Sequence, residues 1–238
     1  MLMNAREQSL DRGYIIYDRD VVQSGEDISF DPKQLADVGS VVSKVRGRGV
    51  AYFIKLKGQD CVLRHYYRGG AIARVIRDKY FWTGIRRTRA WREWCMLEKL
   101  CEMGLPVPRP VAARVLRRGP FYTADIIIER LIGACSLTEL LRQHKLGEDL
   151  WRSIGTCIRR FHDAGVYHAD LNAHNILLKG KDAIYVVDFD RSKLRNQSNR
   201  WRLRNLARLY RSLIKLSKFT DAYYFSDRDW QALCEGYG

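Results

Sequence analysis

The fold is decided by residues 168–190, which read H-A-D-L-N-A-H-N-I-L-L-K-G-K-D-A-I-Y-V-V-D-F-D. Asp170 follows His168 by two positions, Asn175 follows Asp170 by five, and Asp188 ends an apolar run. Phosphoryl transfer needs little from a protein beyond positioning and charge, and these groups supply both. The spacing therefore predicts that Asp170 accepts the proton of an attacking hydroxyl group. Asn175 and Asp188 are predicted to hold the Mg²⁺ ions that bridge the nucleotide phosphates.

A second interpretation of the same stretch is a β-hairpin whose polar residues only cap turns. The short apolar runs at 176–178 and 184–187 agree with a hairpin. A hairpin alone does not explain why a histidine, two aspartates and an asparagine all lie beside these runs. We therefore expect a kinase-like nucleotide site at this position.

The segment ahead of this stretch predicts strands around a glycine loop. Apolar segments at 14–17, 50–54 and 61–66 are typical of strands. Gly47 and Gly49 lie before the second of these segments, and glycines at a hairpin tip let the backbone approach a ligand. We predict that Gly47 and Gly49 cover the nucleotide phosphates; the alternative is an ordinary glycine hairpin.

Helices are predicted at 86–103, 137–143 and 150–164 from apolar residues at three- and four-residue spacing. Gly104 and Pro106 end the first helix, and an extended linker follows at 105–110. A buried strand is expected at 124–131, and the boundary between two lobes is placed there. The predicted fold is α+β. Residues 1–130 form a small antiparallel β lobe with one main helix, and residues 131–238 form a mainly α lobe.

The composition indicates a basic globular protein. The chain has 238 residues, 46% of them hydrophobic, and a formal net charge of +15. Lysines and arginines are concentrated in two segments. Residues 64–92 contain nine of them and one aspartate, and residues 195–218 contain eight and no acidic residue. Such an excess indicates an anionic partner, although a solvated basic face is the plainer alternative. The six cysteines form no C-x-x-C pair, so a structural zinc site is not expected.

Four segments together resemble a known family: G-L-P-V-P-R-P from Gly104, W-R-S-I-G from Trp151, F-H-D-A-G-V-Y-H-A-D-L-N-A-H-N-I-L-L from Phe161 and V-V-D-F-D-R-S from Val186. The pattern is similar to that of the 3-deoxy-D-manno-octulosonic acid (Kdo) kinases. These enzymes form part of the lipopolysaccharide kinase group of the protein-kinase-like superfamily. The resemblance covers most of the chain, roughly residues 46–216, and Y-H-A-D-L-N-A-H-N is its most specific element.

The resemblance implies ATP-dependent phosphorylation of the 4-hydroxyl of Kdo on Kdo-lipid IVA, an acidic glycolipid, with Mg²⁺. It also implies a peripheral position on the cytoplasmic side of the cell inner membrane, next to an anionic surface, and no nucleic-acid partner. Carried over residue by residue, Asp170 matches the catalytic aspartate and His168 the histidine that orders its loop. Asn175 and Asp188 match the metal ligands.

The nucleotide-contacting positions follow from the same resemblance. Glu93 matches the helix glutamate that pairs with a basic residue on the third strand, and Glu98 is the other candidate on that helix. Glu129 and Leu131, at the lobe boundary, are expected to contact the cofactor. Arg64 takes the place of the usual third-strand lysine and is expected to grip phosphate, with Lys55 as the alternative.

The sequence differs from that of the protein kinases at several points. The glycine loop is reduced to Gly47-Arg48-Gly49, and Asp190 stands where a glycine usually follows D-F. Asn172 occupies the position at which serine/threonine protein kinases place a lysine, and only fifty residues follow Asp188. These features favour a small or lipid acceptor over a peptide.

Two other functions remain open at this point. One is a phosphotransferase for a cationic small molecule of the aminoglycoside or choline kind, which would need acidic residues around its acceptor. The other is a nucleic-acid-binding protein on a catalytically inactive kinase fold, with arginines neutralising phosphates and aromatic rings stacking on bases. The basic surroundings argue against the first, and the intact Asp170, Asn175 and Asp188 argue against the second.

The segment 199–218 predicts an amphipathic helix. Leucines at 203, 206, 209, 213 and 216, with Tyr210 and Ile214, share one side; Arg200, Arg204, Arg208, Arg211, Lys215 and Lys218 share the other, and Arg202 alone is out of place. The apolar side is expected to pack in the core. The cationic side is expected either to face water or to contact an anionic membrane, where each charge contributes roughly 1 kcal/mol.

Overall fold

The computed structural model describes residues 3–37, 40–46, 50–68, 78–180, 182–218 and 223–238. The chain divides into two compact units. The first comprises Met1–Glu102 and Pro108–Arg130, and the second Met103–Val107 and Leu131–Gly238. The second unit therefore takes a short segment from the region predicted as the first lobe. The reason is that Val186 N–H donates to the Pro106 carbonyl at 3.0 Å and the Arg160 guanidinium to the Gly104 carbonyl at 3.1 Å.

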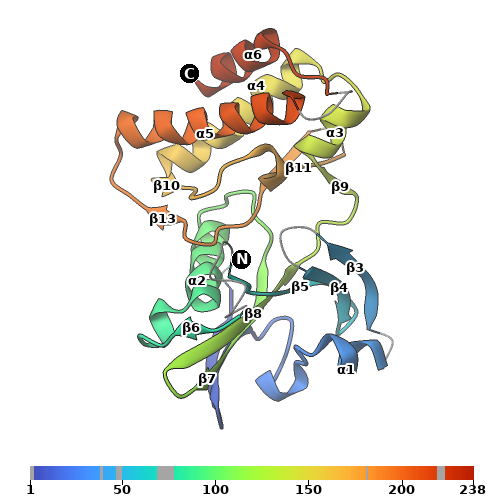
Figure 1. Cartoon of the computed structure of the whole chain (residues 1–238), viewed down its shortest axis with the longest axis vertical. Helices are drawn as coiled ribbons and strands as arrows, with labels where there is room; N and C mark the ends of the chain where they lie inside the picture. Colours follow the sequence, from blue (N-terminus) through green and yellow to red (C-terminus); the bar gives the residue numbers. More distant parts are fainter. Residues whose placement is uncertain (1–2, 38–39, 47–49, 69–77, 181, 219–222) are drawn as a thin grey trace. The chain divides into compact units, whose positions relative to one another are not determined.

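The first unit is built on an antiparallel sheet of eight strands within the described residues (Figure 1). The strand order is β1 (Ala5–Leu10), β2 (Gly13–Asp18), β7 (Pro110–Arg118), β8 (Phe121–Glu129), β5 (Gln59–His65), β4 (Val50–Leu56) and β3 (Val41–Arg46), with β6 (Tyr80–Phe81) paired to β8. The residues predicted as a linker thus lead directly into β7. Pro110 is tolerated because it is the first residue of the strand.

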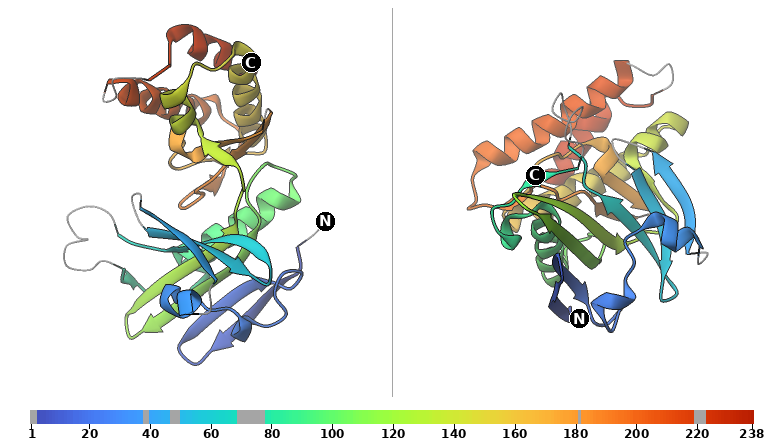
Figure 2. Two further views of the ribbon diagram at one scale, coloured as in Figure 1. Left: turned by 90° about the vertical axis from the view of Figure 1, so that its right-hand side faces the viewer. Right: turned by 60° about the horizontal axis from the view of Figure 1, so that its bottom comes forward.

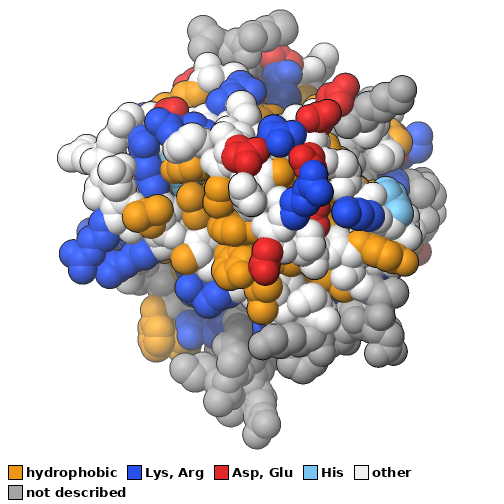
Figure 3. All heavy atoms as spheres, turned by 90° about the horizontal axis from the view of Figure 1, so that it is seen from above, with side chains coloured by type: hydrophobic (Ala, Val, Ile, Leu, Met, Phe, Trp, Pro, Cys, Tyr) orange, Lys and Arg blue, Asp and Glu red, His pale blue; other side chains and the backbone are white. Residues whose placement is uncertain are grey.

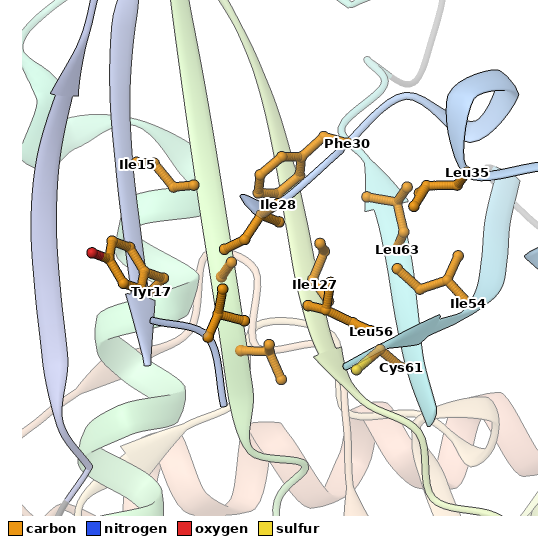
Figure 4. Close-up of a cluster of buried hydrophobic side chains, with 13 residues drawn as sticks. Ile15, Tyr17, Ile28, Phe30, Leu35, Ile54, Leu56, Cys61, Leu63 and Ile127 are labelled. Carbon is orange, nitrogen blue, oxygen red and sulfur yellow. The ribbon is translucent and has the colours of Figure 1, made fainter. Parts of the chain in front are cut away.

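One face of this sheet buries an apolar cluster (Figure 4). Alternate residues of β4 and β5, among them Ile54, Leu56, Cys61 and Leu63, point into it because successive strand side chains face opposite sides. Phe30 and the short helix α1 (Pro32–Asp37), which brings Leu35, cover the cluster. This packing fixes the register of β5 and hence the side on which Arg64 emerges.

The long helix of the first unit, α2 (Arg89–Glu102), begins three residues later than predicted. Residues Ile85–Arg87 form a 3₁₀ turn instead, in which the Thr88 hydroxyl and amide both donate to the Ile85 carbonyl. The predicted apolar repeat is buried: Trp91, Trp94, Leu97 and Leu100 are all at most 2% exposed. Because α2 packs mainly against β7 and β8, it lies on the sheet with this stripe inward.

The second unit is mainly helical, as predicted, and its elements are seen from two further sides in Figure 2. Its helices are α3 (Leu137–Gln143), α4 (Glu148–Asp163), α5 (Asn199–Lys218) and α6 (Asp227–Tyr237). Strands β9 (Ala134–Ser136), β11 (Ile176–Lys179) and β12 (Ala183–Val186) form a small sheet, and β10 (Val166–Tyr167) pairs with β13 (Lys193–Leu194). The two-lobed α+β fold predicted from sequence is confirmed. No helix in the described part of the chain is long and apolar enough to cross a membrane.

Helices α4 and α6 approach each other at two glycines. A Cβ atom on Gly155 would lie 2.0 Å from the Leu233 carbonyl oxygen, and one on Gly236 would lie 2.0 Å from the Arg152 carbonyl oxygen. The two helices therefore touch backbone to backbone at reciprocal points. The Thr156 hydroxyl, which donates to the Gly236 carbonyl at 2.9 Å, lies at the same crossing.

The prediction for α5 is right in its bounds and wrong at Leu203. Leu203, assigned to the apolar side, is 63% exposed, whereas Arg202, the cation that the pattern leaves out of place, is buried. The buried side also contains Trp201 and Asn205. Arg202 is accepted there because its guanidinium donates to the His162 carbonyl at 3.2 Å and to the Asp163 carboxylate at 3.1 Å. Polar partners from another helix thus allow a cation on the buried side at the N-terminal end of α5.

Candidate active site

A hairpin brings Asn175 and Asp188 to the same end of the small sheet. Asn175 directly precedes β11, and Asp188 lies two residues beyond the end of β12. The strands pair with Ile176 opposite Val186, and the Val187 amide donates to the Asn175 carbonyl at 3.0 Å. Asn175 is therefore bonded to the residue next to Asp188. Asp188 has a positive φ of 66°, a conformation that aspartate tolerates better than most residues.

His168 ties the loop that carries Asp170 to the end of this hairpin. Its Nδ1 accepts the Asp170 amide proton at 3.2 Å, so its Nε2 is the protonated nitrogen and donates to the Val187 carbonyl at 3.0 Å. Burial lowers the pKa of His168, which keeps the ring neutral, as this pair of bonds requires. Phe189 packs edge-on against the ring with centroids 4.8 Å apart. His168 therefore joins the backbone of Asp170 to that of Val187, the residue before Asp188.

The backbone of Asp170 is fixed by two asparagines. The side-chain amides of Asn172 and Asn175 both donate to the Asp170 carbonyl, at 3.0 and 2.9 Å. Because Asn175 uses its amide nitrogen in this bond, its side-chain oxygen is the atom left for a cation. An amide oxygen and the Asp188 carboxylate are the hard oxygen ligands that Mg²⁺ takes, with phosphate and water in its other positions.

Helix α5 contacts this loop through three polar side chains. The Asn205 amide donates to the His168 carbonyl at 2.7 Å, and the Ser212 hydroxyl accepts the Ala173 amide at 3.1 Å. Arg208 donates from Nη1 to Oδ1 of Asp170 at 2.9 Å. The sequence predicts Arg208 on a face of α5 that contacts water or a membrane. The structure instead joins it to the predicted catalytic carboxylate.

Asn205 also belongs to a buried chain of hydrogen bonds. Its side-chain oxygen accepts from His162 Nε2 at 3.1 Å, and His162 Nδ1 accepts from the Tyr237 hydroxyl at 2.8 Å. Burial lowers the pKa of His162 to about 4, so the ring is neutral and this donor order is the only consistent one. The chain of bonds runs from α6 through α4 and α5 to the loop.

The first unit contains a separate group of predicted site residues. Arg64 on β5 donates from Nη2 to Oε1 of Glu93 on α2 at 2.5 Å. The Glu93 side chain is 1% exposed, and the Tyr66 hydroxyl donates to its other carboxylate oxygen. A buried carboxylate needs such partners. The pair therefore fixes the end of the arginine side chain, which is 26% exposed.

The alternatives to Arg64 and Glu93 have other surroundings. Burial first, and then repulsion from Glu102 and Asp18, raises the pKa of Glu98 to about 7, so Glu98 lies among acids. The Lys55 side chain is 57% exposed and pairs with Asp60 at 3.9 Å. In the structure, Glu93 is the glutamate of α2 that contacts Arg64.

The remaining predicted positions are less informative. The Glu129 carboxylate accepts the Arg109 amide at 3.3 Å, so its side chain is engaged within the first unit. Leu131 is the first residue of the longer segment of the second unit, and its carbonyl accepts the Ala134 amide at 3.1 Å in a turn. A nucleotide contact at Glu129 or Leu131 stays a prediction. Gly47 and Gly49 lie outside the described residues.

Comparison with known proteins agrees with this geometry. Residues 33–237 match the model of the lipopolysaccharide kinase (Kdo/WaaP) family. The chain belongs to this family. Among the similar proteins of known name, a 3-deoxy-D-manno-octulosonic acid kinase of Photobacterium profundum is 37% identical over 231 residues, which is 97% of each chain.

Two further relatives carry the same name. The 3-deoxy-D-manno-octulosonic acid kinase of Xylella fastidiosa (strain M23) is 47% identical over 193 residues, 80% of this chain and 76% of that one. The kinase of the same name from Xanthomonas axonopodis pv. citri (strain 306) is 44% identical over 207 residues, 86% and 82% of the two chains. Membership of the lipopolysaccharide kinase family makes this protein a phosphotransferase.

The residues that sequence reasoning missed come from α5. Asn205, Arg208 and Ser212 lie between 35 and 44 positions after His168 and Asp170 in the chain, and no local motif links them to the loop. Their shared signal is an i, i+3, i+7 spacing, which places them on one side of a helix. That side lies between the leucine stripe and the exposed cations, where a polar contact to a neighbouring loop can form.

Proposed function

We propose that this protein transfers the γ-phosphoryl group of ATP to the 4-hydroxyl of the Kdo sugar of Kdo-lipid IVA, in lipopolysaccharide core biosynthesis. The observation that carries the proposal is the loop in which hydrogen bonds join His168, Asp170 and Asn175 to one another and to Val187, the residue next to Asp188. Membership of the lipopolysaccharide kinase family and the names of the relatives supply the substrate class.

The residues have distinct roles in this proposal. Asp170 accepts the proton of the Kdo hydroxyl as its oxygen attacks phosphorus, and the phosphorus–oxygen bond to ADP breaks. Asn175 and Asp188 would hold a Mg²⁺ ion, whose charge would offset that of the nucleotide phosphates. Arg64, anchored by Glu93, contacts phosphate from the first unit. His168 is a positioning residue, because both of its ring nitrogens are used in bonds to the backbone.

The charge around Asp170 supports an acidic acceptor. The chain from Arg191 to Lys218 contains no aspartate or glutamate. Within it, β13 pairs with β10, which directly precedes the loop, and the Ser192 hydroxyl accepts the Ala169 amide at 3.2 Å. A cationic acceptor of the aminoglycoside or choline kind would be repelled by such a segment.

The decisive assay combines ATP, Mg²⁺ and Kdo-lipid IVA and locates the new phosphate by NMR. We expect a phosphomonoester on the 4-hydroxyl of Kdo. A phosphate on a glucosamine of the lipid, or turnover of choline or an aminoglycoside instead, would overturn the proposal. Salt-sensitive RNA binding without Mg²⁺-dependent turnover would favour the nucleic-acid alternative.

We also propose that the protein is peripheral to the cytoplasmic side of the inner membrane, held by anionic lipid. Besides Arg208, the exposed cations of α5 among the described side chains are Arg200, Arg204, Arg211 and Lys215. Lysine and arginine side chains gather on the left of the face seen in Figure 3, whereas acidic and basic side chains mix elsewhere on it. Four charges near an anionic leaflet contribute roughly 4 kcal/mol before screening.

A vesicle assay tests the membrane role. Changing Arg204, Arg211 and Lys215 together to Gln should release the protein from anionic vesicles at moderate salt, while Arg208 stays intact because it bonds to Asp170. The control replaces Arg152, Arg159 and Arg228, arginines of α4 and α6 that form surface ion pairs. Equal vesicle binding by the α5 variant and the parent would remove α5 from the proposal.

A further inference from the structure

We propose that Arg208 binds the carboxylate of the acceptor sugar and so aligns its hydroxyl with Asp170; this inference rests on the proposed function. The starting observation is that Arg208 Nη1 lies 2.9 Å from Oδ1 of Asp170. A cation at the predicted proton acceptor needs an explanation, because the transfer of a hydroxyl proton does not itself require one.

Structural support of the loop does not supply that explanation. Asn205 and Ser212 already bond the backbone of the loop on either side of Asp170, at His168 and Ala173. The Arg208 and Asp170 side chains are 45% and 33% exposed. An ion pair with this exposure adds little to stability, because water screens it. The position of Arg208 is therefore better explained by a ligand than by the fold.

The shape of the guanidinium allows two partners at once. Arginine presents a planar fork of donors, and one of its nitrogens can bond Asp170 while another bonds a second carboxylate. The backbone of α5 holds the base of the side chain, since Leu206 and Leu209 are buried on either side of Arg208. An acceptor carboxylate bound to this guanidinium would therefore lie next to Asp170, because the same group already bonds Asp170.

The acceptor in the proposed reaction carries such a group. Kdo is an octulosonic acid, and its carboxylate and its 4-hydroxyl are substituents of the same sugar ring. A bond from Arg208 to the carboxylate would bring the hydroxyl toward Asp170 in one orientation and leave the other hydroxyls out of reach. Arg208 thus contributes both to selectivity for an acidic sugar and to selectivity for the hydroxyl that reacts.

The test compares two acceptors, Kdo-lipid IVA and the analogue in which the Kdo carboxylate is a neutral carboxamide. Because the full-length parent binds the carboxylate, its kcat/KM should be roughly 10- to 100-fold higher for the acid than for the amide. In Arg208→Gln this preference should fall to near unity, with the KM for ATP unchanged. Arg208→Lys should restore part of the preference. The matched control is Arg228→Gln, which removes an exposed arginine that pairs with Glu148 far along the chain from the loop.

The outcomes separate the two proposals. If Arg208→Gln loses the same factor with the acid and the amide, Arg208 acts on Asp170 alone and the inference is wrong, while the proposed function stands. If the parent shows no preference for the acid, the inference is wrong in the same way. If the parent phosphorylates neither acceptor, the proposed function fails, and the inference fails with it.

Discussion

At the residue scale, Asp170 has one set of partners for its backbone and another for its carboxylate. Asn172 and Asn175 bond its carbonyl and His168 bonds its amide, so the main chain is fixed on both sides of the side chain. The carboxylate is approached by Arg208. This separation means that a change of the carboxylate leaves the geometry of the loop in place.

We therefore predict that Asp170→Ala lowers kcat by roughly 10²- to 10⁴-fold, the usual contribution of a general base. Nucleotide affinity should stay near that of the parent, because the residue contacts the acceptor. Single-turnover kinetics and an ATP-binding titration would measure the two quantities. Asp182→Ala, an exposed aspartate in the β11–β12 turn region, is the control. Parent-like turnover of Asp170→Ala would remove Asp170 from the mechanism.

Arg64 and Lys55 give a second comparison between single residues. Arg64→Ala should lower kcat/KM more than Lys55→Ala, because Arg64 is anchored to the buried Glu93 whereas Lys55 is largely exposed. Steady-state kinetics at varied ATP, with thermal unfolding as a check on the fold, would measure the difference. A greater loss in Lys55→Ala would mean that Arg64 serves the stability of the first unit and Lys55 the phosphates.

At the element scale, α5 is a support for the loop as well as a core helix. Asn205→Ala should leave the His162 Nε2–H and the His168 carbonyl buried without this partner, which costs about 1–3 kcal/mol. We expect a lower urea midpoint together with a lower kcat, since the loop loses a tether. Asn196→Ala, an exposed asparagine just before α5, should change neither. A stability loss with kcat unchanged would show that the tether does not affect the loop's active geometry.

The elements also show how far the sequence could be interpreted. The bounds of α5 and α3 follow from helical periodicity, and in α3 also from Ser136, whose side chain and Glu139 form a capping box. The start of α2 lies three residues later than predicted because Ile85–Arg87 folds as a 3₁₀ turn ahead of the helix. Strand β7 and helix α6 were missed; β7 follows a proline-rich segment that was interpreted as a linker.

The residues of the candidate site also differ in whether the sequence could assign them. His168, Asp170, Asn175 and Asp188 lie on one local stretch, where spacing along the chain carries the information. Asn205 and Arg208 meet that stretch only through tertiary packing, so no pattern within α5 could assign them to it. The exposed Leu203 and buried Arg202 have the same origin, since Asp163 and the His162 carbonyl are partners from another helix.

At the scale of the whole molecule, two histidines give the two units opposite responses to pH. His65 in the first unit is partly buried, which alone would lower its pKa, but its hydrogen bond and charge interaction with Asp125 raise the pKa overall. Its contribution to stability is present below pH ~6.5 and is lost as the pH rises through the raised pKa. His162 in the second unit is neutral, with a pKa lowered to about 4. Its contribution is present above pH ~6.5 and is lost as the pH falls toward 4.

We predict that His65→Gln flattens the alkaline side of the stability curve and that His162→Gln flattens the acid side. The acid effect should reach about 3 kcal/mol, from the difference between the ordinary pKa and about 4. Urea unfolding from pH 4 to 9, with hydrogen exchange to assign each unit, would measure both. His144→Gln, which changes an exposed histidine, should leave both sides as they are. Parallel curves for all three variants would contradict the assignment.

The crossing of α4 and α6 limits which sequences this fold can accept. At Gly155 and Gly236 the neighbouring helix backbone occupies the space of a side chain, so even a methyl group has no room. In a library that randomises both helices and selects for folded protein, these two positions should return glycine almost alone. Exposed neighbours such as Ser153 and Gln231 should return most residue types. Alanine recovered often at Gly155 would show that the helices can slide apart, and would mark the crossing as a place where related chains can diverge.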